Sequence, residues 1–308
     1  MTEAKLNIQG LARRDKGLGG MPGLCTYIRP AEGRTFIGQD LNSAEPTVTA
    51  HYSQDSLYRY ATLEGIGKEP YFSEKGILMI DDVYIMFMSN TTHGGAIVRE
   101  AFNKDWDGLT FPQQWLKKSK VIKEYLESSR QYYKMIALAL LYGMGPKKVQ
   151  TQSYEQFSVE LSQQEALSIW QGYWSAFSGV KALSDRLQQK ARHGWIENIF
   201  GYRITFDTSG VKGKDTTHKA CNYLIQSTVS GIMHLYTNLM NKNCLKRGLP
   251  FDFITVIHDE LVLEVDTDKV DSYKAAQQES IDEMNKLINW TVPVLVGFSV
   301  GESFYHIK

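Results

Sequence analysis

The chain has 308 residues, and its 34 Lys plus Arg balance its 34 Asp plus Glu, so the formal net charge is zero. This balance gives no global sign of a polyanionic partner, and a basic surface has to be argued from position. The three cysteines, Cys25, Cys221 and Cys244, lie far apart without metal-binding spacing, which suits a reducing compartment. No signal-peptide core and no apolar run of membrane-spanning length occurs. We therefore expect a cytoplasmic globular protein with one large domain or two moderate ones.

Taken in chain order, the sequence predicts strands near both ends and helices between them. Apolar β-branched runs predict short strands at 24–28 and 35–39, and helical spacing predicts helices at 44–53, 55–65 and 80–90. A long helix is expected over 113–141, with a short break near 127–129 and an end at Gly143, Gly145 and Pro146. Further helix is expected at 163–193 and 216–247, followed by a hairpin at 254–265, a helix at 268–288 and a strand at 292–300. This order indicates an α+β fold, with a sheet assembled from distant segments and a helical insertion that forms a second lobe.

The predicted hairpin, ITVIHDELVLEV, places His258, Asp259 and Glu260 between two β-branched runs. Ionised carboxylates are costly to bury unless they are paired or bind a metal. Mg²⁺ would make the two acids tolerable, and Asp40, at the end of the strand predicted at 35–39, is the natural second carboxylate. Taken alone, the triplet is more commonly a surface turn with two solvated acids, and Asp40 alone is more commonly a helix cap.

The segment RQYYKMIALALLYGMG, residues 130–145, repeats functional side chains every four residues. Arg130, Lys134, Leu138 and Tyr142 would share one slanted face of a helix. Two cations followed by an aromatic ring suit a nucleoside triphosphate. A solvated basic stripe is the commoner explanation for Arg130 and Lys134 alone. The rest of the helix is apolar, however, so we expect these cations to lie at a cleft.

A second helical segment, HKACNYLIQSTVSGIMHL, carries Asn222 and Gln226 four residues apart. Amides at this spacing can donate to the acceptors that every base pair presents in the minor groove. For the motif alone, amides satisfied by nearby backbone are the simpler explanation.

The ordered set of motifs resembles DNA polymerase family A, the DNA polymerase I-like group. The stretch from Asp40 to Glu45 is similar to the family's first motif, Arg130, Lys134, Tyr142 and Gly143 to its fingers-helix motif, and VIHDE at 256–260 to its third motif. Asn222 and Gln226 also fit, as does the C-terminal VGFSVGESF. The resemblance covers nearly the whole chain from about residue 7. Each motif is weak alone, but four in the same order are highly specific.

The resemblance implies a palm, with an antiparallel sheet and helices, plus helical fingers, and the thumb apparently absent. The implied division is an N-terminal part of the palm at 1–70, the fingers at 71–195 and a C-terminal part of the palm at 196–308. The implied activity is DNA synthesis from dNTPs on primer-template DNA with two Mg²⁺ ions. The missing thumb suggests a bacteriophage split polymerase working in the host cytoplasm, with thumb and 3′–5′ exonuclease on a separate polypeptide.

The resemblance also assigns roles residue by residue. It makes four residues catalytic, the first two of them as metal ligands: Asp40, Asp259, Glu260 and Lys134. It places six residues at the incoming dNTP: Arg130, Lys134, Leu138, Tyr142, Glu45 and Tyr84. It places five residues at the DNA: Asn222, Gln226, His258, His218 and Lys219.

Three departures from the family pattern matter. Pro46 and Thr47 replace the Leu-Arg usually found after Glu45, so a local ion pair is missing. Leu138 stands where the family usually has Phe or Tyr, and His218 stands where an Arg is expected. Two other functional classes remain as alternatives: a non-catalytic primer-template or replisome binding module derived from a polymerase, and a single-subunit RNA polymerase. The paired metal acids argue against a binding module, and Glu45 and Glu260 favour DNA over RNA synthesis.

Overall fold

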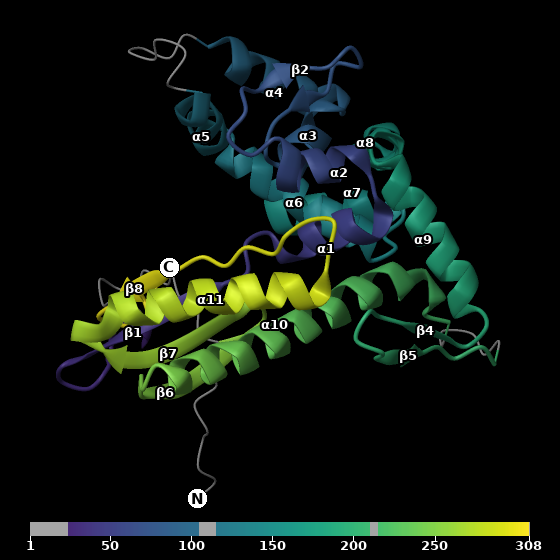
Figure 1. Cartoon of the computed structure of the whole chain (residues 1–308). Coiled ribbons are helices and arrows are strands. Elements are labelled where there is room, and N and C mark those ends of the chain that lie inside the picture. The colour runs from purple at the N-terminus through teal and green to yellow at the C-terminus, as the bar shows by residue number, and fades with distance from the viewer. Residues whose placement is uncertain (1–23, 105–114, 210–214, 308) are drawn as a thin grey trace, which may run out of the picture. The chain divides into compact units, whose positions relative to one another are not determined.

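The computed structural model describes residues 24–104, 115–209 and 215–307 (Figure 1). The chain divides into two compact units. Unit 1 comprises Met1–Ala44 and Val229–Lys308, and unit 2 comprises Glu45–Thr228. The long helix α10 (Ala220–Lys246) belongs to unit 2 in its first part and to unit 1 in the remainder. Within the described ranges, no helix has the length and apolar character that a bilayer crossing requires.

Unit 1 is built on a four-stranded antiparallel sheet with the order β6-β7-β1-β8. Its strands are β1 (Arg34–Asp40), β6 (Phe251–Ile257), β7 (Glu260–Asp266) and β8 (Ser299–Gly301). Strand β1 pairs with both β7 and β8, so residues more than two hundred positions apart lie side by side. The predicted sheet of distant segments and the predicted hairpin β6–β7 are confirmed.

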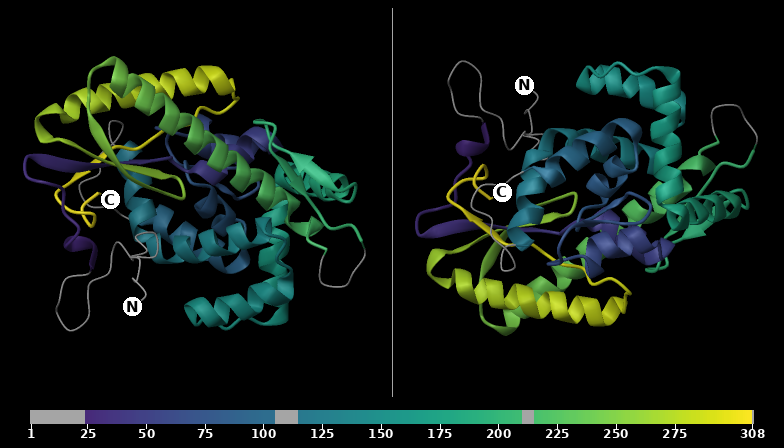
Figure 2. Two further views of the ribbon diagram at one scale, coloured as in Figure 1. Left: turned by 90° about the horizontal axis from the view of Figure 1, so that it is seen from below. Right: turned by 90° about the horizontal axis from the view of Figure 1, so that it is seen from above.

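Both faces of the sheet in unit 1 are covered, which explains why the five central residues of β1 are buried. On one face, Phe36 and Val262 pack with the C-terminal Phe304. On the other face, the Tyr236 hydroxyl of α10 donates to the Gln39 side chain. Helix α11 (Val270–Ile288) runs beside α10 (Figure 2), and Asn243 of α10 donates to Ser280 of α11 at 3.0 Å.

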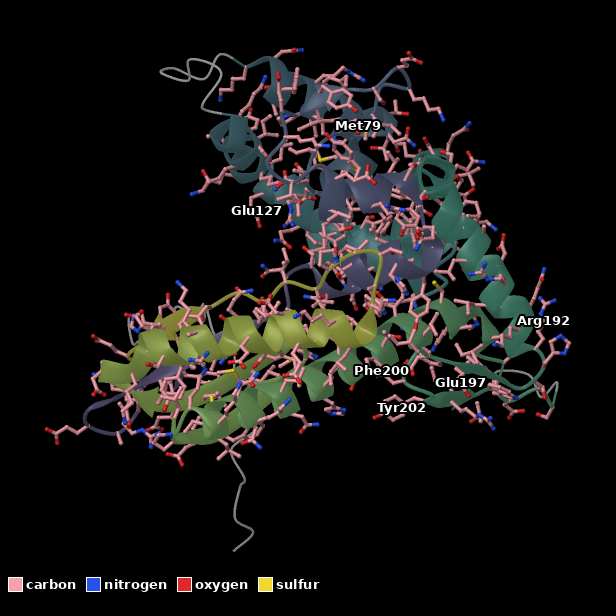
Figure 3. The ribbon with its side chains drawn as sticks, viewed as in Figure 1. Met79, Glu127, Arg192, Glu197, Phe200 and Tyr202 are labelled. Atoms are coloured by element: carbon pink, nitrogen blue, oxygen red, sulfur yellow. The ribbon has the colours of Figure 1, made fainter. Side chains whose placement is uncertain are left out.

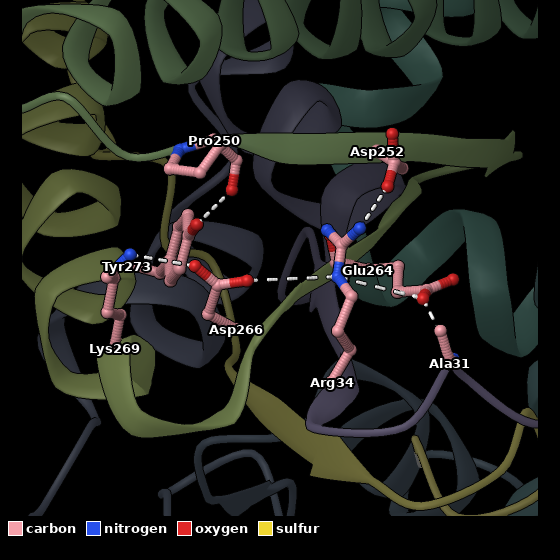
Figure 4. Close-up of polar contacts among 8 residues, drawn as sticks. All are labelled: Ala31, Arg34, Pro250, Asp252, Glu264, Asp266, Lys269 and Tyr273. Carbon is pink, nitrogen blue, oxygen red and sulfur yellow. Dashed lines mark hydrogen bonds and ion pairs between the residues drawn. The ribbon is translucent and has the colours of Figure 1, made fainter.

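Charged side chains lie at the end of the sheet where β1 begins (Figure 4). Arg34 lies opposite Asp266 in the register; its guanidinium pairs with Asp252 and donates to the Glu264 carbonyl at 2.6 Å. Lys269 donates to Asp266 at 2.8 Å, and this hydrogen bond lowers the pKa of the Asp266 carboxyl. Two cations therefore accompany the acids here and help to fix the register of β1 against β7.

Unit 2 is mainly helical. Its helices are α1 (Ala44–Ser53), α2 (Ser56–Arg59), α3 (Val83–Ser89), α4 (Thr92–Asn103), α5 (Trp115–Tyr125), α6 (Glu127–Leu141), α7 (Pro146–Phe157), α8 (Gln163–Ala176) and α9 (Ser178–Ala191). A π-helical turn, Tyr60–Glu64, follows α2, and two short hairpins, Tyr71–Phe72 with Leu78–Met79 and Trp195–Glu197 with Arg203–Thr205, complete the unit.

Helix α3 lies at the centre of unit 2. All seven of its residues are buried, as expected for a helix that is apolar all round. The ring of Phe87 lies 5.2 Å from Tyr133 of α6 and 5.1 Å from Tyr173 of α8, both edge-on. The hydroxyls of Tyr173 and Tyr58 are 2.8 Å apart, so the buried polar tips satisfy each other. This aromatic cluster holds α6 against the centre of the unit.

Two predicted strands differ from the structure, and two helices of the structure were not predicted. The strand predicted at 24–28 is wrong: Leu24–Thr26 forms a 3₁₀ turn, and the C-terminal segment bonds to it through Tyr305 N–H donating to the Cys25 carbonyl. Of the strand predicted at 292–300 only its end lies in β8, and upstream of it the segment makes a single antiparallel bridge, between Val296 and Leu41. Helices α4 and α7 were not predicted. The helical break expected at 127–129 falls at Leu126. The division at residues 70 and 195 stays a prediction.

Candidate functional site

The end of β1 brings two acids together in unit 1. Asp40, the last residue of β1, lies directly opposite Glu260, the first residue of β7. Like charges at such positions repel each other. Glu260 is only 3% exposed, so the explanation of two solvated acids is wrong for this residue. Gly38 provides the room: a Cβ there would lie 2.8 Å from Glu260 Oε1 and 2.7 Å from Ser299 Oγ.

His258 and Asp259 form the two-residue turn between β6 and β7, closed by the pair Ile257 and Glu260. His258 has a φ of 54°, a left-handed conformation that is uncommon outside glycine. Its side chain is exposed, whereas Asp259 is half-buried. The Asp259 carbonyl accepts the Leu41 N–H at 2.9 Å, so the turn is fastened to the residue that follows Asp40. The three acids therefore occupy one end of the sheet, held by backbone hydrogen bonds.

The donor set at this end suits a hard cation. Within the residues that the structure describes, no three His, Cys, Asp or Glu side chains are arranged to hold a metal ion by themselves. Mg²⁺ commonly binds through one or two carboxylates, with water and substrate phosphates completing its shell. Asp40 and Asp259 supply carboxylates of that kind, and the buried Glu260 opposite Asp40 adds charge that a cation would offset. The residues fit a Mg²⁺ site in which the protein supplies two carboxylates and substrate phosphates and water supply the remaining ligands. They do not fit a site made of protein ligands alone.

In unit 2, helix α6 presents the predicted face. Arg130, Lys134, Leu138 and Tyr142 are all partly exposed, although their neighbours on the helix are largely buried. The last three line a groove of ≈ 420 Å³, whose far side is formed by residues of α7, namely Gln152, Gln156 and Phe157. The cleft predicted for the two cations is confirmed for Lys134, whereas Arg130 does not line this groove. The side of the groove formed by α7 was missed, although Gly145 followed by Pro146 at the first helical position was a usable start signal.

Arg130 is held by an acid that the sequence reasoning did not assign. Its Nε donates to Asp82 Oδ2 at 2.6 Å, and its Nη1 lies 3.9 Å from Glu127. Glu127, which Figure 3 labels, is the first residue of α6. Burial lowers the pKa of Arg130, but the Asp82 carboxylate outweighs this and the pKa is raised above its usual value. Arg130 is therefore a paired cation, and the solvated-stripe explanation is wrong for it.

Tyr84 lies beneath both cations of α6. The Arg130 guanidinium lies 5.4 Å and Lys134 Nζ 5.8 Å from the centroid of its ring, within cation–π range. Tyr84 is 7% exposed, and burial raises the pKa of its hydroxyl well above the usual value. It contacts the two cations through its ring face, which orients them on a common side of α6.

Tyr142 connects two other predicted residues in unit 2. Its hydroxyl donates to Glu45 Oε1 at 3.3 Å and accepts from Gln226 Nε2 at 3.2 Å. Burial, then the Glu45 charge, raises the pKa of Tyr142. Gln226 is exposed, whereas Asn222 is 8% exposed and its buried Oδ1 has no hydrogen-bond partner among the residues that the structure describes. The structure thus joins Glu45, Tyr142 and Gln226, which the sequence had placed in three separate motifs.

His218 and Lys219 lie in the 3₁₀ turn Thr217–Lys219 that precedes α10. The ring and the backbone carbonyl of His218 pack against Gly143, the residue after Tyr142: a Cβ on Gly143 would lie 2.8 Å from His218 Cδ2 and 2.9 Å from its carbonyl oxygen. Gly143 also has a φ of 79°. This contact was not predicted, because neither the helix end at Gly143 nor its place in the fingers-helix motif indicates a contact with His218.

Comparison with known proteins gives consistent matches. Residues 93–306 match the family model described as DNA polymerase family A. The chain is 24% identical over 305 residues to DNA polymerase I of Aquifex aeolicus (strain VF5), which covers 98% of this chain and 43% of that protein. It is 25% identical over 290 residues to the DNA polymerase of Escherichia phage T5, which covers 88% of this chain and 30% of that protein.

The fold is also found among solved structures. The POL domain of Pol1 from M. smegmatis, in complex with DNA primer-template and dNTP, superposes with a TM-score of 0.69 over 97% of this chain at 19% identity. The predicted mixed fold of antiparallel sheet and helices is confirmed by this match. The chain spans 45% of that structure, and thus less than half the length of these relatives.

Proposed function

Since this chain belongs to DNA polymerase family A, we propose that it adds dNTPs to a primer 3′-hydroxyl under the direction of a DNA template. The observation that carries the proposal is the meeting of Asp40, Asp259 and Glu260 at one end of the sheet in unit 1. Carboxylates at such a place are stable when they are paired or bind a metal, and Asp40 and Asp259 are ligands of the kind that Mg²⁺ takes. The M. smegmatis relative is described with primer-template and dNTP, and we infer the same ligands for this chain.

Asp40 and Asp259 would hold two Mg²⁺ ions, with Glu260 as an accessory acid. When bound, such ions make the primer hydroxyl a better nucleophile and offset the charge that develops on the pyrophosphate. Asp40 is suited to this role because backbone hydrogen bonds hold the chain around it: its carbonyl accepts the Gly297 N–H at 2.7 Å. A carboxylate on such a rigid frame needs little reorganisation when the charge develops.

Arg130 and Lys134 are proposed to bind the triphosphate. Their shared contact with the Tyr84 ring sets both cations on one side of α6, where phosphate oxygens can accept from them. Lys134 is also proposed to give a proton to the leaving pyrophosphate, as a general acid within hydrogen-bond reach would.

The groove of α6 is proposed to select the sugar and the base. Glu45, held by the Tyr142 hydroxyl, would crowd the 2′ position, so a ribose would clash or lose solvation for its hydroxyl. Leu138 lines the same groove and would pack against the sugar. Five residues are proposed to contact the DNA: Asn222, Gln226, His258, His218 and Lys219. Gln226, His258 and His218 are exposed, Lys219 is partly exposed and Asn222 is buried.

The wider arrangement is also a proposal. As the resemblance of the motifs implied, we propose a bacteriophage split polymerase in which another polypeptide supplies the thumb and 3′–5′ exonuclease. Its site of action would be the cytoplasm of the host cell. Because duplex grip depends on phosphate contacts that weaken with salt, processive extension by this chain alone at physiological salt would contradict the split arrangement.

The proposed activity is tested by single-nucleotide incorporation. The chain is given a primed template at low salt, which strengthens phosphate contacts, with the matching dNTP or rNTP in separate reactions. Incorporation of the dNTP in preference to the rNTP supports the proposal. Preference for the rNTP would indicate an RNA polymerase, and DNA binding without incorporation of either would indicate a binding module.

A further inference from the structure

Asp82 uses both of its carboxylate oxygens to join two helices of unit 2. It is the residue before α3, where its Oδ1 accepts the backbone N–H groups of Tyr84 at 2.9 Å and Ile85 at 3.1 Å. Its Oδ2 accepts Arg130 Nε of α6 at 2.6 Å. One side chain therefore fixes the start of the helix that carries Tyr84 and the orientation of Arg130.

The environment of Asp82 makes this arrangement rigid. Its side chain is 6% exposed, and a carboxylate at that depth is stable only when its oxygens are paired. The helix N-terminus and the guanidinium supply that pairing from two directions. A guanidinium has five N–H donors in one plane, and the bond to Asp82 uses only the donor on Nε. The plane is thereby fixed, and Glu127 lies 3.9 Å from Nη1, outside hydrogen-bond distance, so it does not occupy the Nη donors that would face another anion.

We propose that Asp82 is a positioning residue for the triphosphate site. It holds the Arg130 guanidinium by its Nε edge and, through the start of α3, sets the Tyr84 ring on which Arg130 and Lys134 both lie. This inference rests on the proposed function, in which Arg130 and Lys134 bind the triphosphate. Asp82 itself, as an anion paired within the protein, has no direct contact with the nucleotide.

The preceding acid provides a matched control. Asp81 is also an acid at the start of α3, but it pairs with α5, where Lys123 Nζ lies 2.8 Å away and the Ser119 hydroxyl donates at 2.6 Å. Asp82→Ser removes the bond to Arg130 but keeps a good helix N-cap, because Ser caps about as well as Asp. Asp81→Ser removes a comparable ion pair, the one with Lys123 of α5, which does not involve α6.

The test is the dissociation constant of dATP, with Mg²⁺, on the chain bound to a primed template that offers thymine. Arg130→Gln should weaken binding by roughly ten- to a hundredfold, as expected for loss of a hydrogen bond to a charged group. Asp82→Ser should weaken it by about tenfold, whereas Asp81→Ser should leave it unchanged. In the Arg130→Gln background, Asp82→Ser should add no further loss, because both act through one guanidinium.

The outcomes separate the two proposals. If Arg130→Gln weakens binding and Asp82→Ser does not, or if the two losses simply add, Asp82 has only a structural role and the inference is overturned. If Arg130→Gln leaves dATP binding unchanged, the triphosphate assignment in the proposed function fails instead. Thermal unfolding of each variant verifies folding, and Asp82→Asn, which keeps the side-chain size, replaces Asp82→Ser if the latter does not fold.

Discussion

Gly143 allows a sharp test of how the end of α6 is held. Gly143 and Gly201 have nearly the same φ, 79° and 78°, but only Gly143 has neighbours where a Cβ would point. An L-residue with a positive φ of this size lowers the free energy of unfolding by about 1–2 kcal/mol. Replacing Gly by Ala also reduces the conformational entropy of the unfolded chain, which raises the free energy of unfolding by about 0.4–1 kcal/mol. Gly201→Ala should therefore lower the free energy of unfolding by about 1 kcal/mol.

Gly143→Ala should have the same backbone cost as Gly201→Ala and, in addition, a steric cost. The new methyl group would lie 2.8 Å from His218 Cδ2 and 2.9 Å from the His218 carbonyl oxygen, distances at which atoms must move apart. Overpacking of this kind costs about 1–3 kcal/mol, so the total loss should be about 2–4 kcal/mol. Urea unfolding followed by circular dichroism measures both variants. Equal losses for Gly143→Ala and Gly201→Ala would refute the described packing of His218 on Gly143.

The remaining predictions concern nucleotide selection and alkaline stability. Leu138→Tyr should change the ratio of dideoxynucleotide to deoxynucleotide incorporation, because a ring in the α6 groove adds contact near the sugar; an unchanged ratio in competition assays would contradict that placement. Burial raises the pKa of Tyr133 to about 12 from 10.0. Because this group binds its proton more tightly in the folded state, its stabilising contribution is present below pH 10 and is lost as the pH rises toward about 12. Unfolding free energies measured over this range should fall less steeply for Tyr133→Phe than for the parent, and identical slopes would contradict the assignment.

The fold was predictable where the determinants are local in sequence. The β6–β7 hairpin has β-branched runs on both sides of a two-residue turn, and α10 and α11 have long helical patterns. The errors at 24–28 and 292–300 arose where the pairing is distant. Their backbone groups bond to other segments, as Gly297 N–H does to the Asp40 carbonyl, so alternation of apolar residues could not reveal their conformation.

In the candidate site, too, features set within one segment were predictable and contacts between distant segments were not. The motif residues were predicted from their order along the chain. The structure shows which of them contact one another, and their catalytic and binding roles stay predictions. The pairing of Asp82 with Arg130 and the packing of His218 on Gly143 are contacts through space between distant segments. In the sequence, Asp82 is an acid near the start of the helix predicted at 80–90, where an acid favours the helix N-terminus. Spacing within one helix does not indicate which carboxylate a neighbouring helix supplies.

The most direct test of the proposed polymerase activity is the effect of Asp259→Asn on incorporation and on DNA binding, measured together. Asn keeps the size of the side chain and removes its charge, so incorporation of a dNTP should fall on the order of a thousandfold while primer-template affinity is retained. Asp252→Asn is the matched control, because Asp252 lies on the same hairpin with its side chain 65% exposed and pairs with Arg34 at the other end of the sheet. Full activity of Asp259→Asn, or equal losses in the two variants, would contradict the account.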